Sequence, residues 1–197
     1  MRLADARKDQ YRRLAKDQGY RARSAYKLLQ LNNSYHIIKK GSKVVDLGCA
    51  PGGWMQVVTK EVGQSGKVIG IDLKPVEPIA GATVLKGSIE ELDTLEKIAV
   101  ILGDKADVIL SDLAPNVSGL WDIDHARQIS LSTIALGFAR QVLRVGGSAV
   151  FKVFDGDMLS EFRAELKSSF GRVLLSKPLA SRQESSELYI VCLDFKH

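Results

Sequence analysis

Short apolar runs alternate with longer amphipathic stretches over most of this chain. There are seven such runs, and most of them are short, rich in valine and isoleucine, and bounded by glycine or aspartate, as is typical of buried strands. They cover residues 43–47, 68–72, 83–85, 107–111, 148–154, 173–176 and 188–193. Between them, the spacing of apolar residues predicts helices over 53–62, 89–101, 124–145 and 158–170.

The order of these elements predicts the fold class. Strands that alternate with helices indicate an α/β protein, with a mostly parallel sheet and helices on both faces. Only the short polar segment 177–187 separates the last two strands, so we expect a C-terminal antiparallel hairpin at the sheet edge. Seven strands in this order resemble the Rossmann-like S-adenosylmethionine methyltransferase fold. At 197 residues, a single domain over 1–197 is expected.

The N-terminal fifth of the chain is helical in character and strongly basic. Residues 5–18 and 21–35 have helical patterning, and Gly19 separates them. Residues 1–40 hold eleven Lys or Arg against three Asp, a net charge of +8, while the other 157 residues carry −3. We therefore predict a basic helical extension that packs on the domain and faces a polyanion. A solvated basic helix without a partner is the alternative.

Composition narrows the class of protein further. The sequence is 45% hydrophobic and 26% charged, and it contains no apolar run long enough to span a membrane. The N-terminus has no apolar signal region, so a cytoplasmic protein is expected. Cys49 and Cys192 match no metal or redox spacing and are expected to be reduced structural thiols, and no metal site is predicted.

The loop between the first strand and the first long helix is a candidate cofactor site. Its sequence, DLGCAPGGW at 46–54, lies where the carboxyl ends of parallel strands bind ligands. Gly48, Gly52 and Gly53 allow the backbone to approach a ligand closely. The spacing is not the G-x-G-x-x-G that seats a pyrophosphate, and the bulky Trp54 follows. The loop therefore favours S-adenosylmethionine over NAD.

Asp72 ends the second predicted strand, where a carboxylate can accept both hydrogen bonds from an adenosine ribose. Strand-end aspartates are also common caps, so this residue gains weight only together with the loop.

Lys152 interrupts the apolar strand at 150–154, where a buried cation is costly without a partner. Asp112 and Glu187 lie at strand ends that can supply that partner. A lysine that extends from an edge strand into solvent is the alternative. If it is held and partly desolvated, Lys152 can serve as a general base.

Six segments in order carry a specific resemblance: SAYKLL at 24–29, DLGCAPGGW at 46–54, IDLKP at 71–75, SDLAPNVSG at 111–119, FKVF at 151–154 and SSELYIV at 185–191. With them the chain resembles the RrmJ/FtsJ family of ribosomal RNA ribose 2′-O-methyltransferases, of archaeal and bacterial type. The resemblance implies a catalytic Lys27–Asp112–Lys152–Glu187 tetrad. In this reading Lys152 takes the proton of a ribose 2′-hydroxyl, Asp112 holds Lys152, and Lys27 and Glu187 orient the lysine and the ribose.

The same resemblance implies contacts to S-adenosylmethionine. It assigns them to Gly52, Trp54, Asp72, Ser88 and Asp112, in addition to the loop glycines Gly48 and Gly53. One position departs from the family pattern, because an acid often follows the glycine after the third strand and this chain has Ser88 there.

The predicted function is methylation of a uridine of 23S (large-subunit) rRNA, with rRNA or the assembled large ribosomal subunit as the partner and a monomeric enzyme. Because the basic segment contains Lys27, we expect phosphate contacts from its arginines, Arg7, Arg12, Arg13, Arg21 and Arg23. Tyr11 and Tyr20 can stack on bases or pack internally, and Trp121 can line a substrate groove or simply begin a helix.

Three alternatives remain open. The same chemistry can act on tRNA or an mRNA cap, although no aromatic cap clamp is evident. An NAD(P)-dependent oxidoreductase is opposed by the missing G-x-G-x-x-G and by the lack of a catalytic Tyr-x-x-x-Lys. A non-enzymatic ribosome-assembly factor that retains the fold predicts a broken tetrad, whereas all four residues are present.

Overall fold

The computed structural model describes residues 3–182 and 184–197, and of residues 3–9 it describes the backbone alone. Seven strands form one sheet in the order β3-β2-β1-β4-β5-β7-β6. The strands are β1 Lys43–Leu47, β2 Lys67–Asp72, β3 Thr83–Lys86, β4 Ala106–Ser111, β5 Leu143–Phe154, β6 Phe170–Ser176 and β7 Glu187–Phe195. The helices are α1 Leu3–Asp17, α2 Ala25–Tyr35, α3 Gly53–Val62, α4 Leu92–Leu102, α5 Trp121–Val142 and α6 Leu159–Ser169.

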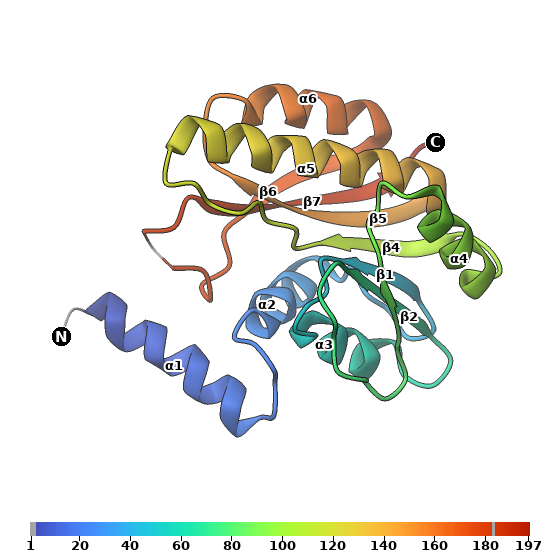
Figure 1. Ribbon diagram of the computed structural model, residues 1–197, viewed down its shortest axis with the longest axis horizontal. Helices are drawn as coiled ribbons and strands as arrows, with labels where there is room; N and C mark the ends of the chain where they lie inside the picture. Colours follow the sequence, from blue (N-terminus) through green and yellow to red (C-terminus); the bar gives the residue numbers. More distant parts are fainter. Residues whose placement is uncertain (1–2, 183) are drawn as a thin grey trace.

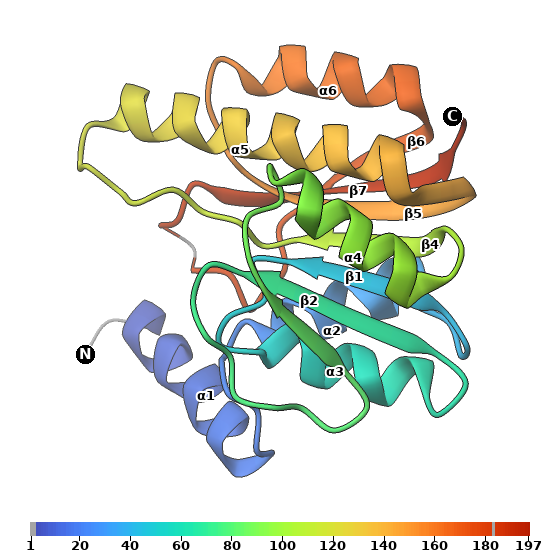
Figure 2. The ribbon, with the colours of Figure 1, turned by 45° about the vertical axis from the view of Figure 1, so that its right-hand side comes forward.

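The predicted fold class is confirmed. Strands β1 to β5 pair in parallel, and β7 pairs antiparallel with both β5 and β6. The expected hairpin is present, but β7 enters the sheet between β5 and β6, so β6 alone forms that edge. Helices cover both faces of the sheet (Figures 1 and 2).

Two apolar clusters, one on each face of the sheet, form the core. One includes residues of α4, α5 and α6, among them Ile98, Leu136 and Phe162, and the other includes residues of α2 and α3, among them Leu28 and Met55. Burial of this apolar surface is the main favourable term in folding.

The N-terminal helices join the body through aromatic rings. Tyr11 of α1 and Tyr20 both contact the ring of Tyr26 in α2, with centroids 5.5 and 5.8 Å away. Gln30 donates a hydrogen bond to the Tyr11 hydroxyl at 3.1 Å. Both tyrosines thus pack internally, which was one of the two roles left open for them.

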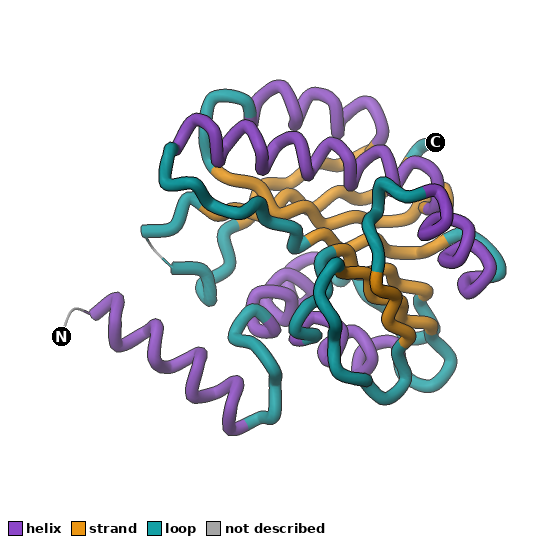
Figure 3. Tube along the Cα trace, in the orientation of Figure 1, coloured by secondary structure: helices purple, strands orange, loops and turns teal. Residues whose placement is uncertain are grey.

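Strand register aligns the carboxyl ends of the parallel strands along one edge of the sheet, whose strands are drawn in orange in Figure 3. Leu47 pairs with Ile71 on one side and with Ser111 on the other, so β1, β2 and β4 end level with one another. Because β7 runs in the opposite direction, its first residue, Glu187, pairs with the last residue of β5, Phe154. The carboxyl ends of β1, β2, β4 and β5 therefore meet the amino end of β7.

Candidate active site

The first of two ion pairs at this edge joins Lys152 and Asp112. Lys152 lies on β5 and is only 7% exposed. Its Nζ is 3.2 Å from Asp112 Oδ1, and it also donates a hydrogen bond to the backbone carbonyl of Asp112. The cation that interrupts the apolar strand is therefore held from the end of the neighbouring strand β4, and does not extend into solvent.

Lys27 and Glu187 form the second pair. Lys27 lies in the first turn of α2, and its Nζ donates to Glu187 Oε1 in close contact. Burial alone would raise the pKa of Glu187, but the ammonium group and hydrogen bond of Lys27, with help from Lys152 and Ser181, lower it below its usual value. Glu187 is thus an anion at neutral pH.

Tyr189 connects the two pairs and was not identified from the sequence. Its hydroxyl lies 2.9 Å from Asp112 Oδ1 and 3.3 Å from Glu187 Oε1, and its side chain is fully buried. Burial, together with the charges of Asp112 and Glu187, raises the pKa of Tyr189 well above its usual value. The hydroxyl keeps its proton, so Tyr189 donates to these carboxylates and does not act as a base.

Two polar residues of α5 hold the backbone at Lys152. The Lys152 carbonyl accepts hydrogen bonds from Gln128 Nε2 at 2.9 Å and from Ser132 Oγ at 3.0 Å. The ladder between β4 and β5 ends one residue earlier, at the pair of Ser111 with Phe151, so this buried carbonyl needs other donors. Gln128 and Ser132 are both buried, and nothing in their spacing distinguishes them from core positions in the sequence.

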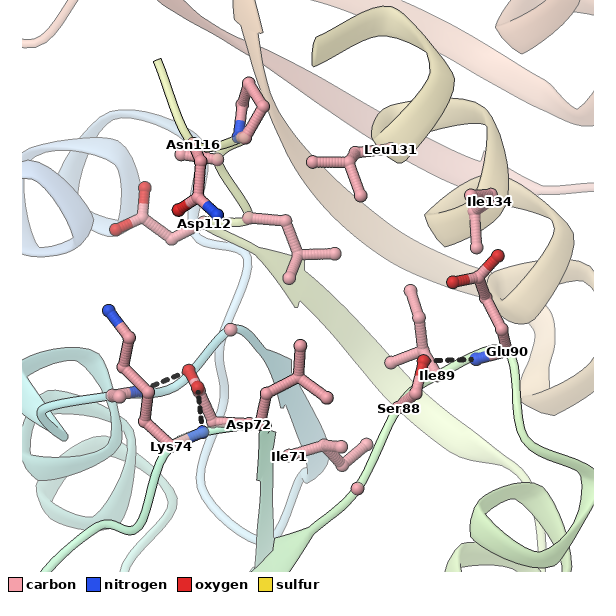
Figure 4. A pocket seen from close by; sticks show the side chains of 17 residues that line it. Ile71, Asp72, Lys74, Ser88, Ile89, Glu90, Asp112, Asn116, Leu131 and Ile134 are labelled. Atoms are coloured by element: carbon pink, nitrogen blue, oxygen red, sulfur yellow. Dashed lines mark hydrogen bonds between the residues drawn. The ribbon is translucent and has the colours of Figure 1, made fainter. Parts of the chain in front are cut away.

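A cavity of about 490 Å³ includes Asp112 of the tetrad in its lining (Figure 4). Four of the predicted cofactor residues line it: Gly48, Asp72, Ser88 and Asp112. Gly48 has a φ of +77°, and a Cβ there would lie 2.9 Å from Leu113 Cδ2. Only a glycine therefore fits this close approach of the loop to the residues that follow β4.

Asp72 is the last residue of β2, and its side chain is held in place by two hydrogen bonds. Its two carboxylate oxygens accept hydrogen bonds from the backbone N–H groups of Ala50, at 2.9 Å, and Lys74, at 2.8 Å (Figure 4). Each oxygen keeps a further lone pair that can accept a ribose hydroxyl.

The remaining walls suit an adenosine with a cationic group. Leu113, Ile89, Leu131 and Ile134 give apolar surface, while Asp112 and Glu90 add carboxylates. Glu90 lies two residues after Ser88 and near Ile89 and Ile134 in Figure 4. Glu90 therefore places a carboxylate in the lining close to position 88, where the family often has an acid and this chain has a serine. S-adenosylmethionine combines an adenosine with a sulfonium and an ammonium group, so these residues fit it.

Asp46 lies fully buried at the base of the cofactor loop. Neither of its carboxyl oxygens has a hydrogen-bond partner among the described residues. Burial, reinforced by the charges of Asp112 and Asp72, raises the pKa of Asp46 well above its usual value. Burial thus favours the neutral form of this side chain, which lies beneath the cofactor loop and is not part of the cavity lining.

Gly52, Gly53 and Trp54 do not line the cavity but pack against neighbouring segments. A Cβ at Gly52 would lie 2.6 Å from Ile79 Cδ1, and one at Gly53 would lie 3.1 Å from Ala22 Cβ. Trp54 is buried, and its indole N–H donates to the Ser24 carbonyl at 2.8 Å. The structure therefore gives these residues a role in packing α3 against the N-terminal segment.

Arg21 and Arg23, which the sequence analysis predicts as phosphate contacts, donate hydrogen bonds to backbone carbonyls in this structure. The Arg21 guanidinium donates to the carbonyls of Glu77 at 2.7 Å, Pro78 at 2.9 Å and Pro51 at 3.3 Å. Arg23 donates to the Ala180 carbonyl at 2.7 Å. The sequence cannot separate this role from phosphate binding, because both need a basic side chain near the site.

The other three arginines predicted to contact phosphates lie on α1. Arg12 and Arg13 are exposed, whereas the side chain of Arg7 lies outside the described residues.

Arg21→Ala is expected to lower the free energy of unfolding by about 1 kcal/mol, because three hydrogen bonds to the cofactor loop and its neighbour are lost. Thermal and urea unfolding measure the effect. The matched control is Arg12→Ala, an exposed α1 arginine whose loss should change stability by less than about 0.5 kcal/mol. Equal stability of the two variants would contradict the structural role of Arg21.

The two cysteines are buried in the core. Burial, with the charges of Asp46 and Asp72, raises the pKa of the Cys49 thiol to about 12, and burial raises that of Cys192 as well. Their thiols are therefore protonated at neutral pH, as expected for structural cysteines.

An open, mostly parallel sheet with an adenosine-sized cavity and a buried lysine paired with an aspartate at its carboxyl edge defines a Rossmann-like methyltransferase. A comparison with known families agrees. The chain belongs to the FtsJ-like methyltransferase family, whose model matches residues 20–195. The resemblance seen in the sequence is confirmed.

Relatives cover nearly the whole chain. It is 52% identical to proteins called "Ribosomal RNA large subunit methyltransferase E" from Methanothrix thermoacetophila and Nitrosopumilus maritimus, covering 96% and 99% of this chain and 73% and 99% of those proteins. A solved ribosomal RNA methyltransferase structure from Plasmodium falciparum superposes with a TM-score of 0.79 at 33% identity, over 89% of this chain and 98% of that one. No helix in the described part of the chain is long and apolar enough to cross a membrane.

Proposed function

We propose that this protein transfers the methyl group of S-adenosylmethionine to a ribose 2′-hydroxyl of large-subunit ribosomal RNA, on a uridine. The observation that carries the proposal is the ion pair between buried Lys152 and half-buried Asp112 beside the adenosine-sized cavity. The names of the archaeal relatives support the choice of RNA.

S-adenosylmethionine supplies an electrophilic methyl group and leaves as a neutral thioether. Asp72 would accept hydrogen bonds from its ribose, the apolar residues around Ile89 and Leu131 would enclose its adenine, and Asp112 would face its positive charges. Ser88 and Glu90, which flank Ile89 in the lining, would be the polar residues beside the adenine.

The tetrad acts on the RNA ribose. In its neutral form the Lys152 amine accepts the proton of the 2′-hydroxyl while the oxygen attacks the methyl group. Asp112 keeps the Lys152 side chain in place, and the Lys27–Glu187 pair positions the ribose with Tyr189 between them. Most of the rate enhancement would come from alignment of the oxygen, the methyl group and the sulfur.

The basic extension would bind the RNA backbone. Arg12 and Arg13 on α1 are the exposed candidates for phosphate contacts, together with Arg7, while Arg21 and Arg23 shape the site through their carbonyl contacts. We take residues 1–197 as one methyltransferase domain, with 1–40 as this extension, acting as a monomer in the cytoplasm on rRNA or the assembled large subunit.

The test is methyl transfer from labelled S-adenosylmethionine to isolated ribosomal subunits, to total RNA and to tRNA, followed by nucleoside analysis. The proposal expects 2′-O-methyluridine in large-subunit RNA. Label in tRNA alone would overturn the substrate but keep the chemistry. Bound cofactor without label in any pool would favour an assembly factor that retains the fold.

Asp72→Ala is expected to weaken binding of S-adenosylmethionine by about 10- to 100-fold, because a charged acceptor for two hydroxyl groups is lost. Isothermal titration calorimetry measures the dissociation constant. Asp93→Ala, which removes an exposed carboxylate on α4, serves as the control and should leave it unchanged. Unaltered affinity in Asp72→Ala would remove Asp72 from the cofactor site.

A further inference from the structure

Trp121 begins α5 and remains 47% exposed although two other rings stack with it. Its centroid lies 5.9 Å from that of His125, with 18° between the planes, and 6.0 Å from that of Phe154, with 27° between the planes. A tryptophan that is exposed and yet held by two rings offers a flat apolar surface to another molecule.

The segment that carries Trp121 is fixed on both sides. The buried carboxylate of Asp124 accepts hydrogen bonds from the N–H groups of Ser118 and Gly119, at 2.7 and 3.0 Å. The imidazole of His125 lies against Gly156, and its Nε2 accepts from the Met158 N–H at 3.1 Å. The position of the Trp121 ring is therefore set before any ligand arrives.

This ring cluster lies next to the tetrad. Phe154 follows Lys152 by two residues on β5 and pairs with Glu187 of β7, while Lys152 pairs with Tyr189. Since side chains alternate along a strand and paired residues share a face, these four side chains lie on one face of the ladder. The Trp121–Phe154 rings thus extend the surface on which the ribose would react.

The charge around the site favours a nucleic acid as the occupant. Figure 1 shows that α1 and the loop before α5 lie at the same end of the sheet, with the segment between β6 and β7 between them. The exposed arginines of α1 can bind phosphates on one side, while an aromatic ring on the other side suits a base. Bases of unpaired RNA stack readily on tryptophan.

We propose that Trp121, supported by His125 and Phe154, is a stacking platform for an unpaired base of the RNA, on the methylated nucleotide or its direct neighbour. This inference rests on the proposed function and specifies how that substrate is positioned. Trp121 is a positioning residue, because it contacts the base and takes no part in the transfer of the methyl group.

The test compares Trp121→Ala and Trp121→Phe with Leu120→Ala, which removes the adjacent apolar side chain, 61% exposed. Loss of one stacked base should raise the KM for the RNA pool that accepts label by about 5- to 150-fold in Trp121→Ala. Trp121→Phe keeps an aromatic face and should recover most of this loss, and Leu120→Ala should stay within about twofold of the wild type. The dissociation constant of the cofactor should not change in any variant.

Two further readouts separate stacking from general damage. The slope of log affinity for RNA against log salt should be unchanged in Trp121→Ala, whereas loss of a phosphate contact such as Arg12 should reduce it by about one. The chain has two tryptophans, and Trp54 is buried. Quenching of tryptophan fluorescence by oligouridylate should therefore be present in the wild type and lost in Trp121→Phe.

The outcomes are distinct. An unchanged KM in Trp121→Ala, equal losses in Trp121→Ala and Leu120→Ala, or equal quenching in Trp121→Phe and the wild type would each overturn the platform. So would a Trp121→Ala defect confined to association with a second copy or another protein. A wild type that methylates no RNA but is quenched by oligouridylate at Trp121 would instead refute the proposed function and retain a base-stacking site.

Discussion

Lys152→Ala is expected to reduce methyl transfer by at least about a thousandfold, the upper part of the range for loss of a general base. A 2′-hydroxyl is a weak nucleophile and needs a base to accept its proton. Lys152 is a buried amine on β5, paired with Asp112 of the cavity lining. Among the described residues around it, Tyr189 keeps its proton, and the carboxylates of Glu187 and Asp112 are engaged with Lys27 and with Lys152 itself.

Single-turnover rates with saturating RNA and S-adenosylmethionine measure the chemical step directly. The cofactor affinity and the RNA affinity of Lys152→Ala should remain close to wild type, which separates a catalytic loss from a binding loss. Lys97→Ala is the matched control, because it removes an exposed lysine that is also paired with an aspartate. A rate within tenfold of wild type would show that Lys152 is not the base.

The hydrophobic pattern predicted each strand and each helix that the structure describes, but it missed several boundaries. β5 begins at Leu143, five residues before the predicted run, because residues 144–146 are exposed and break the apolar pattern. α5 begins at Trp121, where Asp122 and Asp124 in the first turn conceal the apolar period while they suit the positive end of the helix. The insertion of β7 between β5 and β6 depends on pairing between distant segments, which no local pattern encodes.

For the site, the sequence indicated the four charged tetrad residues, but it indicated neither Tyr189 between them nor Glu90 in the cavity lining. Lys152 stood out because a cation in an apolar strand needs a partner. Tyr189 became evident only with the register that pairs it with Lys152, although it lies two residues after Glu187 and so on the same face of β7. Arg21 shows what charge alone does not predict. Its charge suggested a phosphate contact, whereas in the fold its guanidinium donates to three backbone carbonyls.

Asp112 links the two halves of the site, since it lines the cofactor cavity and also accepts from Tyr189 and Lys152. Its loss should therefore affect cofactor binding and the chemical step together, unlike the loss of Lys152. We expect Asp112→Ala to lower the methyl-transfer rate by at least about 100-fold and to weaken binding of S-adenosylmethionine by about tenfold.

The decisive comparison is the double variant Lys152→Ala/Asp112→Ala. If Asp112 acts on the chemical step by holding Lys152, its removal has little left to disturb once the lysine is gone, and the double variant should transfer methyl groups about as slowly as Lys152→Ala alone. Asp112→Asn retains an oxygen that accepts the Tyr189 hydroxyl, so it should keep the wild-type stability while it loses the charge that holds the lysine. Single-turnover rates and calorimetric cofactor titrations are measured on the wild type, Lys152→Ala, Asp112→Ala and the double variant. They give the effect of each change on the chemical step and on cofactor affinity. Additive losses in the rate would mean that Asp112 contributes to transfer independently of Lys152, through the cofactor cavity alone.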